Sequence, residues 1–234
     1  MVHHPGTASD NSAVALSIRR AAQLSYFSRR VTCRLATSHD ERDAIFKLRY
    51  QSYLLTGLIS KNSFERYIET ADHAANSYLI GLYVGCKLVS SLRLQIGSAT
   101  TPNFSSLELF PHVLKALLEI NRTIVDMGCV AADGGLSGLY VWLPYLALRP
   151  WIMAAEYFHA DYMVAATRPE YRPFYQRALG CELHSGLQPA PHHTGRVALA
   201  TLDFATSAKR LYESFPFLRS TPTERERLFE HNPS

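Results

Sequence analysis

The chain has 234 residues, of which 47% are hydrophobic and 19% charged, an ordinary composition for a globular protein. Its net charge of +4 is too mild for a typical nucleic-acid binder, in which basic residues cluster densely. Apolar stretches are too short to span a bilayer, and the four cysteines form no Cys-x-x-Cys pair, which argues against a zinc site and a disulfide framework. We therefore expect a cytoplasmic protein with reduced thiols, no metal and no nucleic-acid partner.

The first 30 residues lack apolar periodicity, and we expect a flexible segment there with a possible helix over residues 13–24. Residues 31–234 then form one domain. The sequence of its first half predicts a strand at 31–36 and a helix at 40–56, which follows a capping box from Ser38 to Glu41. After an ordered loop or short helix at 62–69, we expect a β-hairpin of strands 77–84 and 88–96. A helix at 107–120 follows.

The second half begins with a predicted strand at 123–131 and a glycine-rich turn at 133–138. The segment 139–159 contains Pro144 and Pro150, so we expect a kinked or split helix there. The remaining expected elements are a buried strand at 161–166, a helix from about 169 to Gly180, a short strand from Cys181, a loop at 186–195, a strand at 197–204, and helices at 205–214 and 223–230. Such mixing predicts an α+β domain with a mixed, mostly antiparallel central sheet flanked by helices.

The stretch from Asp161 to Glu182 contains a buried strand, a short helix with Phe174-Tyr175, and then Leu179-Gly180 before the next strand. This arrangement resembles the C-terminal half of GNAT-type acyltransferases. The resemblance implies a GNAT-like fold and makes Tyr175 a candidate general acid for a thiolate leaving group. Alternatively, Phe174 and Tyr175 are aromatic core residues on one helix face.

Arginine within the apolar strand that contains Arg93 is costly unless it pairs with a carboxylate or faces a polar cleft. We therefore expect Arg93 to contact Asp72, Glu69 or a ligand. Together, Arg49, Tyr53, Asp72 and Arg93 resemble the pattern of the autoinducer synthases. Those enzymes carry a Glu-x-x-Arg pair on the next strand. Here Asp126 stands for the acid, but Cys129 replaces the arginine, which makes homoserine-lactone synthesis doubtful.

A closer resemblance, to the N-acyl amino acid synthases, covers most of the chain after about residue 38. It rests on Leu48-Arg49-Tyr50-x-x-Tyr53, Ser91-Leu92-Arg93-Leu94, Arg149-Pro150-Trp151, Arg168, Phe174-Tyr175-x-Arg177 and Phe215-Pro216-Phe217. The resemblance implies transfer of a long-chain fatty acyl group to the α-amine of an amino acid. The donor would be an acyl-phosphopantetheine thioester on acyl carrier protein, and no cofactor would be permanently bound.

The expected site follows from this chemistry. An amine must lose a proton before it attacks a thioester, and Asp72, Glu69 and Asp126 are the candidate bases, with Asp72 slightly preferred. Arg93 or Arg49 would bind the carboxylate of the amino acid. Backbone N–H groups of the strand from Ser91 to Leu94 would hold the oxyanion. By resemblance, the substrate-binding residues are Arg49, Tyr53, Ser91, Leu92, Trp151 and Arg168. Apolar residues of the 139–158 segment and the first helix would line an acyl channel.

The turn at 133–138 lacks the basic start and glycine spacing of a pyrophosphate-binding loop, which favours carrier protein over coenzyme A as the donor. Other hypotheses remain: an acetyl-CoA-dependent acetyltransferase, an enzyme like the acyl-homoserine-lactone synthases, or a non-catalytic acyl-binding domain. The sequence gives neither the acceptor amino acid nor the chain length nor the oligomeric state.

Overall fold

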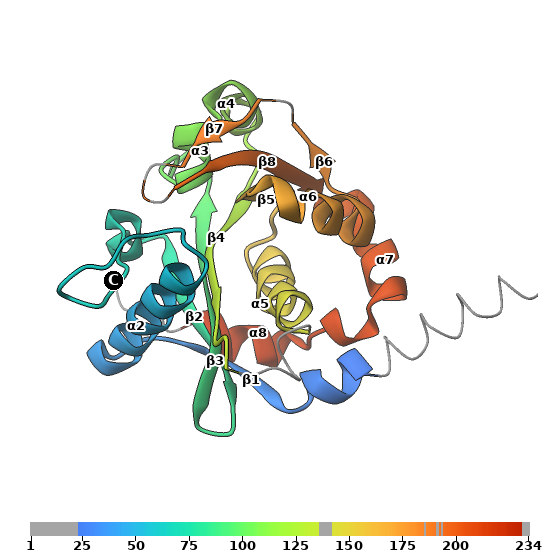
Figure 1. The fold of residues 1–234 in the computed structure, drawn as a ribbon. Coiled ribbons are helices and arrows are strands. Elements are labelled where there is room, and N and C mark those ends of the chain that lie inside the picture. Colours follow the sequence, from blue (N-terminus) through green and yellow to red (C-terminus); the bar gives the residue numbers. More distant parts are fainter. Residues whose placement is uncertain (1–22, 136–141, 185, 191, 193, 231–234) are drawn as a thin grey trace, which may run out of the picture.

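The computed structural model describes residues 23–135, 142–184, 186–190, 192 and 194–230. One sheet organises it, in the order β1-β2-β3-β4-β5-β8-β6, with β7 paired to β8 (Figure 1). The strands are β1 (Val31–Leu35), β2 (Ser77–Val84), β3 (Lys87–Gly97), β4 (Ile124–Ala132), β5 (Tyr162–Thr167), β6 (Glu182–Leu183), β7 (Gln188–Pro189) and β8 (Arg196–Asp203). Only β4 and β5 pair in parallel, so the expected mixed, mostly antiparallel sheet is confirmed.

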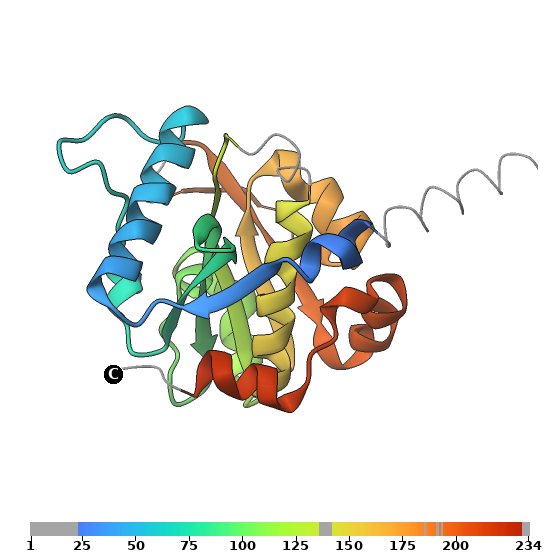
Figure 2. The ribbon, with the colours of Figure 1, turned by 90° about the horizontal axis from the view of Figure 1, so that it is seen from below.

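Helices lie on both faces of the sheet, which Figure 2 shows with α2 on one side and α5 on the other. The α-helices are α2 (His39–Leu55), α3 (Ser105–Leu109), α4 (Pro111–Glu119), α5 (Leu143–Tyr157), α6 (Arg172–Phe174), α7 (Phe204–Ser214) and α8 (Pro222–Phe229). Shorter turns are 3-10 turns at Thr70–His73, Pro169–Tyr171 and Pro216–Leu218 and a π-turn at Tyr175–Leu179. Among the described residues, none of the helices has both the length and the apolarity needed to cross a membrane.

Local sequence signals account for α2 and the hairpin. The Ser38 hydroxyl accepts a hydrogen bond from the Glu41 N–H, and the Glu41 carboxylate accepts one from the Ser38 N–H, so the predicted capping box is confirmed. Gly85, with φ of 60°, makes the tight turn between β2 and β3. The predicted link of Gly85-Cys86-Lys87 was one residue too long, because Lys87 already pairs with Val84.

Three helix predictions need correction. The single helix expected at 107–120 is two helices, because Pro111 begins α4 and cannot continue α3. In the described part of 139–159, α5 is neither split at Pro144, which lies in its first turn, nor ended by Pro150, which lies inside it. The helix expected from 169 to Gly180 breaks into a 3-10 turn, one short α-turn and a π-turn, although it ends at Gly180 as predicted.

The N-terminal prediction also needs correction at its end. Residues 1–22, which include most of the possible helix at 13–24, lie outside the described residues. Residues 23–28 are helical, however, and Leu24 is 2% exposed within the main core. Phe27 stacks on Trp142 with ring centroids 6.2 Å apart. Residues 23–28 therefore belong to the folded body, and the flexible segment expected over 1–30 extended too far.

The two faces of the sheet have separate cores. On one face α5, α7 and α8 pack over β2 to β5, with Trp151, Leu92 and Met163 among the buried residues. On the other face α2 packs over β2 to β4, while α3 and α4 pack over β4, β5 and β8. Strand alternation divides the residues this way, since Leu92 and Arg93 must point to opposite faces. The face with α2 and α3 leaves a space between these helices, and the polar residues of β3 and β4 point into it.

Candidate active site

A buried cluster of charges lies between α2, the 3-10 turn at Thr70–His73 and β3. Asp72 Oδ1 accepts hydrogen bonds from Arg49 Nη1 at 2.8 Å and from Arg93 Nη1 at 3.2 Å. The same Arg93 nitrogen lies 2.8 Å from Glu69 Oε2. The expectation that Arg93 is paired with Asp72 or Glu69 is confirmed.

Each member of the cluster is held by its own element. Asp72 Oδ2 accepts the backbone N–H of Glu69 at 2.8 Å, which caps the 3-10 turn and fixes the Asp72 carboxylate. Arg49 lies on the inner side of α2 and is fully buried. Its Nε and Nη2 have no hydrogen-bond partner among the described residues. Arg93 Nη2 donates to Ser105 Oγ at 2.8 Å, so the cluster also joins β3 to α3.

The two carboxylates differ in exposure and are both ionised. Burial opposes ionisation of Asp72, but Arg49 and Arg93 outweigh it and hold its pKa below the usual value. For Glu69 burial is likewise outweighed, by Arg93 and by a hydrogen bond from Tyr67, and its pKa is also lowered. The Asp72 side chain is fully buried, whereas that of Glu69 is 11% exposed. Of the two, Glu69 is the carboxylate that a ligand can reach.

A third carboxyl group, that of Asp126, lies on β4, where Asp126 pairs with Gln95 of β3. Its oxygens accept the Ser106 N–H at 2.8 Å and the Ser106 hydroxyl at 2.7 Å. Burial raises the pKa of Asp126, against the effect of these hydrogen bonds. Asp126 is therefore the carboxyl in the site that most readily holds a proton.

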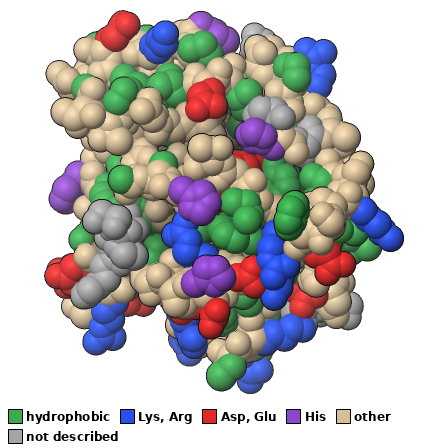
Figure 3. Space-filling view, turned by 90° about the vertical axis from the view of Figure 1, so that its left-hand side faces the viewer, with side chains coloured by type: hydrophobic (Ala, Val, Ile, Leu, Met, Phe, Trp, Pro, Cys, Tyr) green, Lys and Arg blue, Asp and Glu red, His purple; other side chains and the backbone are tan. Residues whose placement is uncertain are grey.

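These groups border one pocket of about 370 Å³. Glu69, Arg93 and Asp126 share its wall with Tyr53 and Tyr67. Asp72 and Arg49 do not line it. The other walls come from α3, the middle of β4, the end of β5 and the turn before β8. Figure 3, which looks at the molecule from the α2 side of Figure 1, shows acidic, basic and histidine side chains mixed with hydrophobic ones.

A larger hollow of about 690 Å³ runs along β1 and α8 but is a weaker candidate site. Its two carboxylates, Glu41 and Glu224, are the capping residues of α2 and α8. They are therefore already engaged by backbone N–H groups. Arg149, also in its wall, donates to backbone carbonyls and to Glu224. The carboxylates and Arg149 of this hollow are thus engaged in helix capping and in contacts between elements, so we assign the site to the smaller pocket.

Strand β4 is irregular beside the pocket. Its register with β3 shifts between the pairs Ser91–Ala131 and Arg93–Gly128, so Cys129 and Val130 together face one β3 residue. Cys129 has a φ of 51°. The ladder between β4 and β5 ends at Asp126–Val164, while β4 continues to Ala132, and the strands then separate (Figure 1).

The expected oxyanion site needs correction on this point. Backbone N–H groups of the strand from Ser91 to Leu94 were expected where two strands splay. That part of β3 is instead a central strand, paired with β2 on one side and β4 on the other. The opening lies between β4 and β5, because their parallel ladder covers only three residue pairs. Ser91 and Leu92, both fully buried, do not line the pocket.

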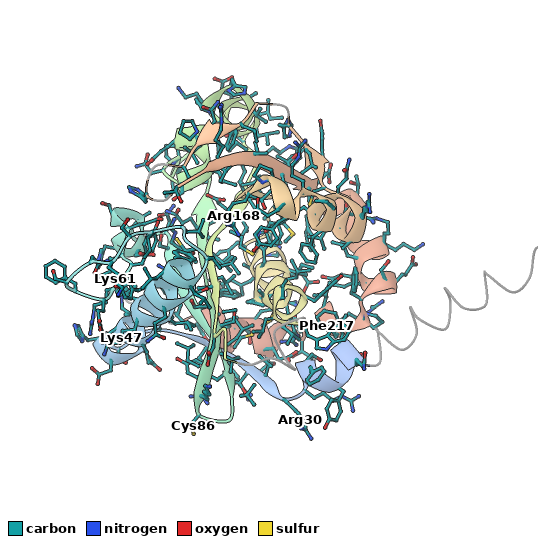
Figure 4. The ribbon with its side chains drawn as sticks, in the orientation of Figure 1. Arg30, Lys47, Lys61, Cys86, Arg168 and Phe217 are labelled. Carbon is teal, nitrogen blue, oxygen red and sulfur yellow. The ribbon has the colours of Figure 1, made fainter. Side chains whose placement is uncertain are left out.

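Three predicted residues lie away from the pocket wall. Tyr175 and Trp151 belong to the core on the α5 face, with ring centroids 6.4 Å apart, and the Trp151 indole donates to the Val125 carbonyl at 3.1 Å. Arg168 follows β5 directly and pairs with Glu170 at 3.1 Å (Figure 4). Burial raises the pKa of Tyr175, so its phenol stays protonated.

The two segments expected to line an acyl channel lie on opposite faces of the sheet, with α2 on one and α5 on the other (Figure 2). The glycine-rich turn at 133–138 lies largely outside the described residues. Among the residues that the structure does describe, no group of three or more His, Cys, Asp or Glu side chains could hold a metal ion.

Sequence reasoning missed three residues that complete the site: Tyr67, Ser105 and Ser106. Tyr67 donates from its hydroxyl to Glu69 Oε1 at 2.5 Å, and Ser105 joins Arg93 to Gln95. All three lie in a loop or a very short helix, where periodicity carries no signal. Only the cost of burying Asp126 within an apolar strand could have indicated that it needs a partner such as Ser106.

Comparisons with known proteins identify the family and the fold. The family model described as FeeM, N-acyl amino acid synthase, matches residues 44–203. The structure of FeeM from uncultured soil microbes has 18% identity, covers 79% of this chain and 97% of that one, and gives a TM-score of 0.63. The AHL synthase LasI has 18% identity over 79% and 95% of the two chains, with a TM-score of 0.58. TofI, solved with an inhibitor and MTA, has 14% identity over 81% and 100%, with a TM-score of 0.58. No curated protein matches.

Proposed function

The chain belongs to the FeeM family of N-acyl amino acid synthases and is an acyltransferase of GNAT-like fold, and we propose that it joins a long-chain fatty acyl group to the α-amine of an amino acid in the cytoplasm. One observation carries the proposal beyond the family. A pocket with an accessible carboxylate, Glu69, and a buried arginine, Arg93, lies on one face of the sheet beside the opening between β4 and β5. An acceptor amine on this face and a thioester in that opening would meet.

The proposed reaction is the attack of the neutral amine on the thioester carbonyl. The C–N bond forms, the C–S bond breaks, and the proton lost by the amine replaces the acyl group on sulfur. We assign the first proton transfer to Glu69, because it borders the pocket and is ionised. Asp72, slightly preferred from sequence, is fully buried and does not line the pocket, so we give it a structural role.

Asp126 is the alternative base, and its raised pKa brings it closer to a proton-transfer role. We favour Glu69 because its side chain is 11% exposed, whereas Asp126 is only 3% exposed. The backbone N–H groups of β4 near the bulge at Cys129, rather than those of β3, would stabilise the oxyanion, because β4 has no β5 partner there.

The carboxylate of the acceptor would bind Arg93. Arg93 borders the pocket whereas Arg49 does not, although two Arg49 nitrogens lack hydrogen-bond partners among the described residues. The hydrogen bond from Arg93 Nη2 to the neutral Ser105 hydroxyl is the one that a carboxylate would replace, since an ionised acceptor binds guanidinium more strongly. Tyr175, which stays protonated and lies on the α5 face, would donate a proton to the departing thiolate if the donor arm enters from that face.

Acyl carrier protein is the donor that we propose. The mixed charges on the α2 face offer no uniform attraction to an acidic protein (Figure 3), so docking would involve the basic residues near the N-terminal helix, Arg29 and Arg30. Arg30 lies at the other end of the molecule from α4 (Figures 1 and 4). Attraction of this kind weakens as salt rises.

The experiment compares long-chain acyl carrier protein with the matching acyl-CoA, at low and high salt, by release of free thiol with each amino acid. We expect a higher kcat/KM with carrier protein and a loss of that advantage at high salt. The double change R29E/R30E should raise the KM for carrier protein and spare kcat. The control K115E/R122E changes charge equally at the α4 end and should leave KM unchanged.

Other outcomes reject parts of the proposal. Equal kcat/KM for both donors without a salt effect would reject the carrier protein and favour coenzyme A. Turnover of acetyl-CoA alone would indicate an acetyltransferase. Absence of thiol release with either donor and all amino acids would indicate an acyl-binding domain.

A further inference from the structure

Tyr67 contacts the carboxylate to which we assign base chemistry. Its hydroxyl donates to Glu69 Oε1 at 2.5 Å, while Arg93 Nη1 lies 2.8 Å from Oε2. The two oxygens of Glu69 are thus held from two sides, and the carboxylate has little rotational freedom. We propose that Tyr67 is a positioning residue that fixes the Glu69 carboxylate in the pocket and orients it for proton abstraction. This inference rests on the proposed role of Glu69.

Tyr67 is itself rigidly placed. Its side chain is 7% exposed, and its ring packs edge-on against Tyr53 with centroids 4.9 Å apart. Its backbone N–H donates to the Phe46 carbonyl at 3.1 Å, which ties the loop after α2 back onto that helix. The neighbouring Arg66 pairs with Asp43 on the same helix. The hydroxyl is therefore delivered to Glu69 from a fixed support.

The direction of the hydrogen bond is set by burial. Burial and the Glu69 charge raise the pKa of Tyr67 far above its usual value, so the phenol remains a donor at any working pH. The other groups that act on Glu69 come from the neighbouring elements. Asp72 opposes its ionisation and Arg93 favours it. Asp126 and Cys129 on β4 and Tyr53 on α2 also interact with it electrostatically.

Y67F removes the hydroxyl and keeps the ring. Loss of the hydrogen bond should raise the pKa of Glu69, because that bond favours the ionised form. The acid limb of the pH profile of kcat/KM should therefore move to higher pH. Near neutral pH we expect kcat/KM to fall by roughly tenfold, because one oxygen of the Glu69 carboxylate is no longer held in place. This loss is smaller than the 10²–10⁴-fold typical of losing the base itself.

Y212F is a matched control. Tyr212 donates to Glu156 Oε1, also at 2.5 Å, and joins α7 to α5 away from the pocket. This variant should lose a comparable hydrogen bond and leave the acid limb where it is in the wild type. E69Q should remove the acid limb altogether.

A second measurement does not depend on turnover. The Glu69 carboxyl carbon is followed by NMR in protein labelled with ¹³C-glutamate and identified by its absence in E69Q. We expect its titration midpoint to rise in Y67F and to stay unchanged in Y212F. An unchanged midpoint in Y67F would overturn the role of Tyr67, whatever the activity. A raised midpoint combined with wild-type turnover in E69Q would instead reject Glu69 as the base, and with it the positioning role for catalysis.

Discussion

At the scale of single residues, the site is a chain of charges that have been removed from water. Arg49, Asp72, Arg93 and Glu69 are linked in series by three ion pairs, in which two arginines share Asp72 Oδ1 and two carboxylates share Arg93 Nη1. Such clusters are stable only when every charge keeps its partner, since an unpaired buried ion is very costly. The same residues therefore support both the fold and the proposed chemistry.

R93A tests this dependence. Removing Arg93, which is 2% exposed, leaves Glu69 without its cation and Asp72 with only Arg49. We expect the free energy of unfolding to fall by about 3–5 kcal/mol, measured by urea denaturation. R122A is the control, because the pair of Arg122 with Asp161 is partly exposed, and its loss should cost at most about 1 kcal/mol. Equal stability of R93A and wild type would remove Arg93 from the buried cluster.

The pH dependence of stability has a defined sign. The pKa of Glu69 lies below its ordinary 4.5 in the folded protein, so its contribution is complete above that pH and is lost as pH falls through the folded value. The difference in unfolding free energy between wild type and E69Q should therefore shrink on acidification. Asp126 acts oppositely, because its raised pKa gives stability at low pH that is lost as pH rises. A difference that grows in acid would contradict the ionised state of Glu69.

Some of this residue-scale detail follows from sequence and some does not. The cost of an arginine in an apolar strand was enough to predict the pairing of Arg93 with an acid. The sequence could not show which of Asp72 and Glu69 a ligand can reach, because the exposure of the two carboxylates depends on how the 3-10 turn packs against α2. Tyr67 gave no signal, because a tyrosine in an aperiodic loop fits many environments.

At the scale of elements, prolines and glycines decide where helices begin and end. Pro111 starts α4 and separates it from α3, and this brings Ser105 and Ser106 to the site on a five-residue helix. Gly180 ends the turn that begins at Tyr175 with φ of 71°. The position of Tyr175 therefore depends on a left-handed residue that only glycine adopts easily.

G180A should destabilise the protein more than G57A. Both glycines have positive φ, at 71° and 69°, so both substitutions strain the backbone by about 1–2 kcal/mol. A methyl group at Gly180 would also collide with the Arg210 guanidinium, which donates to the Leu179 carbonyl, whereas at Gly57 it would meet nothing within 4 Å. Thermal unfolding of the two variants makes the comparison. A smaller effect in G180A would show that the turn can relax.

Strands were more predictable than helices in this chain. Alternation and the glycine turn gave β2 and β3 to within one or two residues. The helix predictions failed at prolines: Pro111 is in the first turn of a separate helix, α4, and Pro150 is accommodated inside α5 among buried residues such as Trp151. Packing decides whether a helix continues through a proline, and sequence periodicity alone does not show how the helix packs.

At the scale of the whole molecule, the sheet divides two halves of the proposed reaction. The carboxylates and Arg93 lie on the α2 face, and Tyr175 lies on the α5 face, with the opening between β4 and β5 connecting them. The two segments expected to line an acyl channel are therefore separated by the sheet, and residues from both could meet only at this opening. The order of the helices along the chain does not reveal the face on which each one packs.

Truncation tests the extent of the folded body. Deletion of residues 1–12, which lack apolar periodicity, should leave stability unchanged. Deletion of residues 1–28 should lower it, because it removes Leu24 from the core and Phe27 from Trp142. L24A is the matching point change and should cost about 2–5 kcal/mol. Equal melting temperatures for all three variants and the wild type would show that residues 23–28 contribute nothing.

The most direct test of the account is the product itself. Purified protein is incubated with long-chain acyl carrier protein and a mixture of ¹⁵N-labelled amino acids, and the products are identified by mass spectrometry. We predict a ¹⁵N-labelled N-acyl amino acid, formed in proportion to the thiol released and nearly absent in E69Q, whose fold is checked by circular dichroism. Thiol release without any labelled amide, or equal amide formation by E69Q, would contradict the account.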